Sequence, residues 1–264
     1  GIDIDLAAIP LDDAKTYDML AKGETVGVFQ VESAGMRKAL VEMKASRFED
    51  IIALVALYRP GPMANIPVYC ARKHGLEQRE RVVSGCVERS IPKAKADEIF
   101  DLLAKFADYG FNKSHAAAYA LVSYQTAYLK ANYPVEFMAA SMTLDLSNTD
   151  KLSEFRREAL RLGIPVDPPS INRSGVHFDV ADGHILYALA AVKGVGAQAV
   201  EAIVQARGDK PFRDLGDFAQ RINPRMLNRK TLENLASAGA FDDLEPNRAA
   251  AFAAIDQVLA EAQR

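Results

Sequence analysis

Apolar residues in the first 162 positions recur mostly at steps of three and four, which is the spacing of one face of a helix. This pattern predicts helices over residues 10–22, 33–43 and 48–58. The last is ended by Arg59-Pro60-Gly61-Pro62, because two prolines around a glycine stop a helix. Further helices are expected over residues 78–89, 91–106, 114–133, 134–144 and 149–162. Residues 25–31 alternate loosely and are the best strand candidate in this half.

The pattern changes after residue 163. Three prolines precede two β-like runs, residues 176–180 and 185–189, and the Ala181-Asp182-Gly183 segment between them is a hairpin turn signal. Helices then return, each preceded by a bend that contains glycine or asparagine. We therefore predict a mainly α fold. Its boundaries are a multi-helical region over residues 1–165 and a β-hairpin with tandem helix-hairpin-helix units over residues 166–264.

Composition and charge narrow the class of protein. With 49% hydrophobic and 25% charged residues, the 264-residue chain is typical of a folded globular protein. No uncharged apolar run reaches membrane-spanning length, and the N-terminus lacks the pattern of a signal peptide. Cys70 and Cys86 have no metal-ligand spacing and indicate reduced thiols in a cytoplasmic protein. The net charge of −3 means that any nucleic-acid binding must use local patches and backbone amides.

The first candidate site is the start of the helix at residues 114–133. Ser114 stands where an N-cap is expected, and Lys113 and His115 flank it. A cation, an imidazole and unpaired amides at a helix N-terminus can together hold a phosphate. The alternative is a capped core helix that binds nothing, and the local pattern favours it, because helix N-termini are common and phosphate sites are not.

A second candidate is the Val192-Lys193-Gly194-Val195-Gly196 segment, which leads directly into a helix. Its glycines remove side-chain obstruction, so backbone amides can approach a phosphate. The segment does not fit the dinucleotide fingerprint, which needs a third glycine and a later acidic residue.

Residues 225–252 repeat this arrangement with one glycine, Gly239, between two helices. Arg229 and Lys230, with Arg225 and Arg248, make this surface basic. Two hairpins in tandem favour contact with both strands of a duplex. An ordinary solvated helical face remains the alternative.

Four segments of the chain resemble the C-family of bacterial replicative DNA polymerases, the DNA polymerase III alpha subunits. They are VGVFQVESAGMRKAL, FEDIIALVALYRPGP, YGFNKSHAAAYALVSYQTAYLKANYPVEFMAA and AVKGVGAQAVEAI. The resemblance covers essentially the whole chain. It implies that residues 1–165 are fingers material and that the later residues include the helix-hairpin-helix units that hold the duplex behind the active site.

The resemblance also implies positions for individual contacts. Lys113 and His115 match the NKSH motif, at the face of the fingers toward the nascent base pair. Lys193, Gly194 and Gly196 match the first DNA-binding hairpin of the family, and Gly239 matches the second. Arg59, Arg72 and Lys73 lie in matching segments without an implied role.

Catalysis in this family is attack of a primer hydroxyl on a deoxynucleoside triphosphate, assisted by two magnesium ions on palm aspartates. Those aspartates are expected before the start of this chain. Asp3 and Asp5 are not their equivalents, so we predict no catalytic residue, metal ligand or cofactor here. A segment with the triphosphate-binding arginines is also expected to be missing, with the join near Leu76–Gln78. The chain is therefore predicted to be inactive alone.

The partners that the resemblance implies are primer–template duplex and, for the parent protein, the nucleotide, sliding clamp, clamp loader and proofreading subunits. Two alternatives to a polymerase fragment remain open. The chain could be a stand-alone, non-specific duplex-binding module, or a helical domain that contacts other replisome proteins without catalysis.

Overall fold

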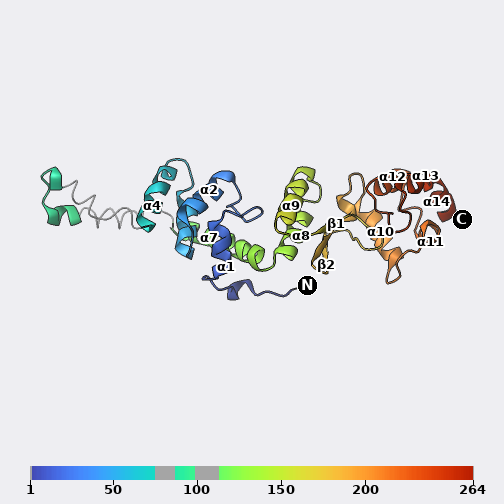
Figure 1. Cartoon of the computed structure of the whole chain (residues 1–264), viewed down its shortest axis with the longest axis horizontal. Helices are drawn as coiled ribbons and strands as arrows, with labels where there is room; N and C mark the ends of the chain where they lie inside the picture. Colours follow the sequence, from blue (N-terminus) through green and yellow to red (C-terminus); the bar gives the residue numbers. More distant parts are fainter. Residues whose placement is uncertain (1, 75–86, 99–112, 264) are drawn as a thin grey trace. The chain divides into compact units, whose positions relative to one another are not determined.

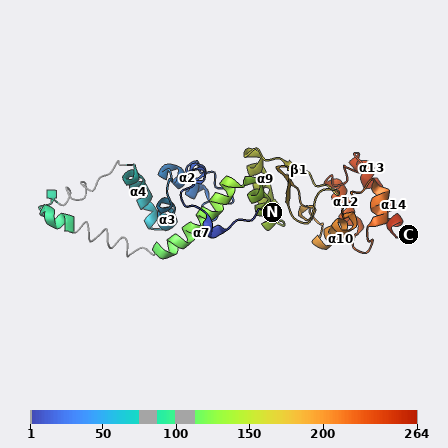
Figure 2. The ribbon, with the colours of Figure 1, turned by 90° about the horizontal axis from the view of Figure 1, so that it is seen from below.

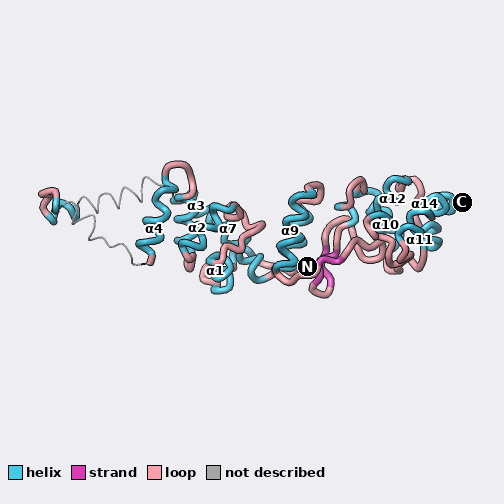
Figure 3. The backbone as a smooth tube through the Cα atoms, turned by 45° about the horizontal axis from the view of Figure 1, so that its top comes forward, coloured by secondary structure: helices cyan, strands magenta, loops and turns pink. Residues whose placement is uncertain are grey.

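The structure, a computed structural model, describes residues 2–74, 87–98 and 113–263 (Figure 1). It contains two compact units, Gly1–Tyr133 and Pro134–Arg264. Helices predominate in both, and strands are short and confined to the second unit within the described residues (Figure 3). The predicted mainly α fold is confirmed. Of the helices expected at 78–89 and 91–106, residues 78–86 and 99–106 lie outside the described residues, and residues 93–98 are helical as expected.

The first unit is built around the long helix α7 (Lys113–Asn132), which packs against α1 (Ala14–Ala21) and α3 (Phe48–Leu57) (Figure 2). The small buried residues Ala120 and Ala127 let these helices approach closely. Between them lies Tyr124, fully buried, whose hydroxyl donates to the Pro10 carbonyl at 2.7 Å. Helix α7 is therefore the core element of this unit.

The remaining described elements of this unit are α2 (Ala34–Met43), α4 (Ile66–Lys73) and the 3₁₀ helices η1 (Leu6–Ala8) and η2 (Pro62–Asn65). Side-chain caps mark the starts of α1 and α2. The Asp13 carboxylate accepts from the Thr16 amide at 2.8 Å, and the Ser33 hydroxyl caps α2. Helix α7 begins at Lys113, so Ser114 lies inside its first turn and the predicted N-cap is wrong.

Residues 25–31 form turns, and the predicted strand is wrong. The backbone of residues 24–31, which we call the 24–31 loop, is held by side chains of α7 instead of a neighbouring strand. Buried Lys130 donates through Nζ to the carbonyls of Glu24 and Val26, at 2.9 and 2.8 Å. The Phe29 amide donates to Thr126 Oγ1 at 3.2 Å. The segment's apolar alternation therefore reflects packing on a helix.

A buried carboxylate joins α4 to α3. Asp50 has a fully buried side chain and accepts hydrogen bonds from the Ser46 amide, the Tyr69 hydroxyl and Lys73 Nζ, at 2.9, 2.9 and 2.5 Å. Desolvation raises the pKa of Asp50, but these hydrogen bonds outweigh it and leave the pKa below its usual value. Lys73 therefore has a structural role in this unit.

The second unit begins with α8 (Pro134–Leu144) and α9 (Thr149–Arg161), which contact a three-stranded sheet of order β1-β3-β2. Strands β2 (Asp179–Ala181) and β3 (His184–Leu186) form the predicted antiparallel hairpin, with Val180 opposite Ile185. The turn residues Asp182 and Gly183 have φ of 53° and 78°, as a type I′ turn requires. Strand β1 (Val166–Asp167), which was not predicted, pairs with β3 in parallel.

Because α8 and α9 pack on this sheet, the compact units divide between Tyr133 and Pro134, earlier than the boundary predicted near 165. The assignment of residues 1–165 to the fingers stays a prediction.

The rest of the second unit is helical. After η3 (Leu189–Ala191) come α10 (Ala197–Arg207), α11 (Leu215–Arg221), α12 (Arg229–Ser237), α13 (Arg248–Ala253) and α14 (Ile255–Ala262). Their core includes the rings of Phe212, Phe218 and Phe241, packed edge to face with centroids 5.0 and 5.2 Å apart.

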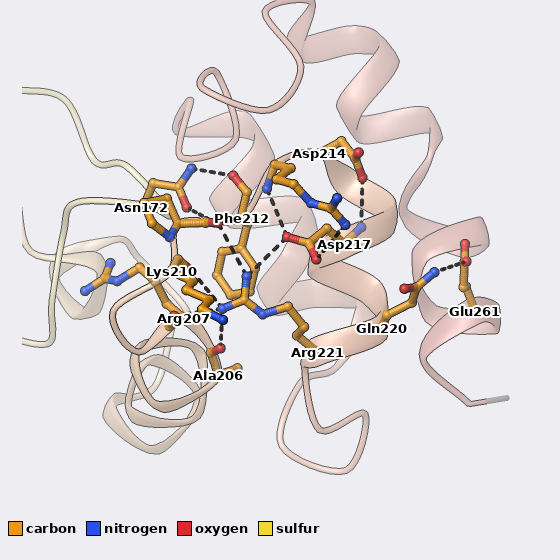
Figure 4. Close-up of polar contacts among 12 residues, drawn as sticks. Asn172, Ala206, Arg207, Lys210, Phe212, Asp214, Asp217, Gln220, Arg221 and Glu261 are labelled. Atoms are coloured by element: carbon orange, nitrogen blue, oxygen red, sulfur yellow. Dashed lines mark hydrogen bonds and ion pairs between the residues drawn. The ribbon is translucent and has the colours of Figure 1, made fainter.

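Arg221 connects α11 to the end of α10 (Figure 4). Its Nη2 donates to the carbonyls of Ala206, Arg207 and Lys210 at 2.7–2.8 Å, and its guanidinium lies 4.5 Å from the Phe212 ring centroid. Ala206 and Arg207 belong to the last turn of α10, where a helix leaves its carbonyls without intrahelical partners, and Lys210 lies just beyond it. Arg221 thereby fixes the orientation of α10, the helix that carries the first hairpin.

Candidate nucleic-acid interface

The first hairpin presents open backbone amides to solvent. Gly194 has φ of 79°, and Gly196 is the N-cap of α10. Lys193, Gly194 and Gly196 are exposed, whereas Val195 between them is buried and anchors the bend. Within the described residues, no group accepts a hydrogen bond from the amides of Gly194, Gly196 or the first two residues of α10. These donors and the positive end of the helix are suited to a phosphate oxygen.

The two glycines of this hairpin are needed for different structural reasons. A Cβ on Gly194 would lie 2.5 Å from Asn234 Nδ2, so the hairpin packs closely on α12. A Cβ on Gly196 would meet nothing within 4 Å, so it would project into open space. Gly194 therefore shapes the hairpin, and Gly196 keeps its approach open.

The second hairpin differs, because its amides are already used. Gly239, with φ of 84°, donates to the Ala236 carbonyl at 3.0 Å, and the next amide donates to the Leu235 carbonyl at 2.9 Å. Gly239 is buried beneath the guanidinium of Arg248, whose Nη2 would lie 2.3 Å from an added Cβ. In this conformation Gly239 offers no amide to a ligand. A contact of Gly239 with DNA stays a prediction.

Most of the basic residues predicted for this surface have acidic partners. Arg229 pairs with Glu233 at 2.9 Å and with Asp256 at 3.0 Å, and these carboxylates raise its pKa. Lys230 also lies near Glu233, and Arg248 pairs with Asp242 at 2.7 Å. The exposed Lys193 and Arg225 differ: among the described residues no carboxylate lies within 4 Å of their charged groups. The positive charge of the first hairpin is therefore less neutralised than that of the second.

In the first unit, His115 lies at an exposed cleft of about 310 Å³. The cleft is lined by Gln30, Ser33, Met36, Val55, Tyr58, Arg59, His115 and Tyr119. Lys113 is the first residue of α7, but its side chain lies outside the described part, as does that of Arg72. Arg59 stands at this cleft, on the turn that ends α3.

Two aromatic residues of this region, Phe29 and Tyr119, were not predicted. Their rings stack with centroids 6.0 Å apart and planes at 23°, and the His115 ring lies 4.5 Å from Tyr119. The helical spacing of His115 and Tyr119, four residues apart, was a signal in the sequence. Phe29 gave no such signal, because it lies in the segment interpreted as a strand.

Nothing in the described residues forms a group of three or more His, Cys, Asp or Glu side chains able to hold a metal ion. The donor set that magnesium would require is therefore not found in the part of the chain that the structure describes. A membrane-spanning helix is likewise not found among the described residues, since none combines the necessary length and hydropathy.

Comparison with known proteins covers both units. Residues 1–107 match the bacterial DNA polymerase III alpha subunit finger domain, and residues 163–251 match the helix-hairpin-helix motif. The DNA polymerase III subunit alpha of Caulobacter vibrioides is 45% identical over the whole chain. Those of Thermus aquaticus and Escherichia coli are 42% and 40% identical, over 98% and 99% of the chain.

The matched segment is only part of each relative: the chain spans 26–28% of their length. The alignment with the Caulobacter protein extends over 322 positions, although this chain has 264 residues. The relatives therefore contain residues within the matched region that this chain lacks. The predicted join near Leu76–Gln78 lies outside the described residues. By sequence, the chain matches a fragment of the bacterial DNA polymerase III alpha subunits, namely their finger domain and helix-hairpin-helix region.

Proposed function

We propose that this chain supplies the duplex-holding and nucleotide-facing parts of a DNA-directed DNA polymerase, and that it performs no nucleotidyl transfer alone. In the complete protein, it would act in the cytoplasm on primer–template DNA. The observation that carries the proposal is the first hairpin, with exposed amides at the start of α10 beside Lys193.

The chemistry of this hairpin fits the sugar-phosphate backbone better than it fits bases. Amides at a helix N-terminus bind phosphate oxygens and read no sequence. Lys193 adds one cation, and Arg229 and Lys230 would contribute on binding if phosphate displaced their carboxylate partners. We therefore expect weak, non-specific duplex binding that decreases steeply with salt.

The nucleotide-facing role rests on His115, which is exposed at the cleft, together with Lys113 at the start of the same helix. Transfer itself would need palm carboxylates and two magnesium ions. The described residues do not supply such a donor set, and we assign no step of the reaction to them.

Duplex binding can be tested with a fluorescein-labelled duplex and the whole chain, by anisotropy at several salt concentrations. Gly196→Val places a side chain in the open approach to the amides and should weaken binding, while thermal unfolding stays near that of the parent. Gly216→Ala, on α11 of the same unit, is a glycine control outside the hairpins. Equal binding by Gly196→Val and the parent would exclude the hairpin as the contact.

Primer extension with magnesium and all four deoxynucleoside triphosphates tests the second part of the proposal. We expect no extension by this polypeptide, and robust extension would contradict it.

The alternative is a helical domain that contacts the sliding clamp, clamp loader or proofreading subunit. The acidic net charge of −3 favours it, because the chain as a whole does not attract DNA. Pull-down with each purified subunit separates the two functions: capture of a subunit without any duplex binding would favour the alternative.

A further inference from the structure

The guanidinium of Arg248, which covers Gly239 in the second hairpin, is held by a single carboxylate. Its Nε lies 3.0 and 3.1 Å from the two oxygens of Asp242, and its Nη2 lies 2.7 Å from one of them. A guanidinium makes the same two-pronged contact with a phosphate. Among the described residues, the Asp242 carboxylate has no other hydrogen-bond or ion-pair partner. It therefore occupies the position on Arg248 that a backbone phosphate would take.

A second group of opposite charges lies at the start of α12. The Glu233 carboxylate lies 2.9 Å from Arg229 and 3.7 Å from Lys230, and the Asp256 carboxylate of α14 lies 3.0 Å from Arg229. The side chains of Arg229 and Lys230 are nevertheless 61% and 75% exposed, so a phosphate could reach them. These carboxylates therefore neutralise the surface without burying it.

The two groups of charges are separate. They lie at opposite ends of the nine-residue helix α12, about 14 Å apart at 1.5 Å per residue. Ion pairs at exposed positions contribute little to folding, but each would have to be broken before its cation could bind a phosphate. A carboxylate left beside the duplex would also repel it. These pairs should therefore affect duplex binding more than they affect stability.

We propose that Asp242, Glu233 and Asp256 form a carboxylate mask, which takes the place of DNA phosphates on the second hairpin and limits its affinity for a duplex. This inference rests on the proposed function, which brings the helix-hairpin-helix units to DNA. It adds that the second hairpin would bind phosphate through the Arg248 side chain instead of the Gly239 amide. The first hairpin would then supply most of the affinity.

Variants of the whole chain that remove one negative charge test the mask, by anisotropy of a fluorescein-labelled duplex. Asp242→Asn keeps the side-chain shape and releases Arg248. The dissociation constant should fall about 2- to 5-fold, the factor that corresponds to the strength of one surface ion pair. The released cation should also steepen the dependence of the logarithm of affinity on the logarithm of salt concentration by about one. Glu233→Gln should act in the same direction, and the two effects should add because the groups are well separated.

Two controls separate local release of a cation from a change in net charge. Asp182→Asn removes one negative charge from the exposed β2–β3 turn, where asparagine tolerates the φ of 53°, and should bind nearly as the parent does. Arg248→Gln removes the cation that the mask covers. Addition of Asp242→Asn to Arg248→Gln should therefore give no gain in affinity. Circular dichroism and thermal unfolding confirm that each variant is folded.

Unchanged binding by both Asp242→Asn and Glu233→Gln would overturn the mask. Equal tightening by Asp182→Asn, or a gain that persists without Arg248, would overturn it as well. Gly196→Val, measured in parallel, tests the proposed function separately. If Gly196→Val binds as the parent does while Asp242→Asn binds more tightly, the first-hairpin contact is refuted and the mask is supported. If Gly196→Val weakens binding while neither carboxylate variant changes it, the mask alone is refuted.

Discussion

Replacement of Asp50 by asparagine tests whether the buried ion pair holds the first unit together. The variant keeps the shape of the side chain but removes the charge that faces Lys73 Nζ at 2.5 Å and the Tyr69 hydroxyl at 2.9 Å. Loss of one partner from a buried pair typically costs about 3–5 kcal/mol. The Lys73 side chain is 12% exposed and can regain some hydration, so we expect a loss near the lower limit, about 3 kcal/mol.

Urea unfolding followed by tyrosine fluorescence measures this loss. The chain has no tryptophan, and eight of its nine tyrosines lie in residues 1–133, so the signal reports mainly on the first unit. Asp18→Asn is the matched control, because Asp18 pairs with Lys22 at 2.6 Å but both side chains are more than half exposed. That variant should change the free energy of unfolding by less than about 1 kcal/mol.

Two further measurements test the reasoning, and the absence of either expected result would refute it. Addition of Lys73→Met to Asp50→Asn removes the unpaired ammonium and should restore part of the stability, whereas a purely steric effect would not be relieved. Folding lowers the pKa of Asp50, so its stabilising effect is present above its unfolded-state pKa. This stability is lost as the pH falls through the lower, folded-state pKa, and Asp50→Asn should remove that part of the acid dependence.

Three other substitutions test separate parts of the structure. Gly194→Ala should destabilise the second unit by about 1–2 kcal/mol in thermal unfolding, because of its positive φ and its contact with α12, whereas Gly196→Ala should change stability by less than about 0.5 kcal/mol. Lys130→Met should leave two carbonyls of the 24–31 loop without a donor and speed amide hydrogen exchange there by at least about 10-fold; unchanged exchange would contradict this support. Arg221→Lys should lower the free energy of unfolding by about 2 kcal/mol, since lysine cannot contact three carbonyls and the Phe212 ring at once. A thermal-unfolding midpoint equal to that of the parent would show that those contacts are dispensable.

The candidate sites were only partly predictable. The first hairpin was found because glycine, lysine and a following helix are neighbours in sequence, and the structure places Lys193, Gly194 and Gly196 at the surface. The same reasoning treated Gly239 as equivalent, but a guanidinium nine residues later covers it. Phe29 and Tyr119 are ninety positions apart, and no local pattern relates them.

Local sequence determined where helices begin and where the chain turns. The caps at Asp13, Asn228 and Asn247 and the Asp182-Gly183 turn use side chains and φ angles within a few residues, so their energetics are present in the sequence pattern. Tertiary structure decided the rest. Alternating apolar residues in the 24–31 loop pack equally well on a strand or on a helix. The choice depended on hydrogen-bonding side chains of α7, the donor Lys130 and the acceptor Thr126, more than ninety residues away. Likewise, whether a glycine bend offers its amide to a ligand depends on which distant side chain covers it.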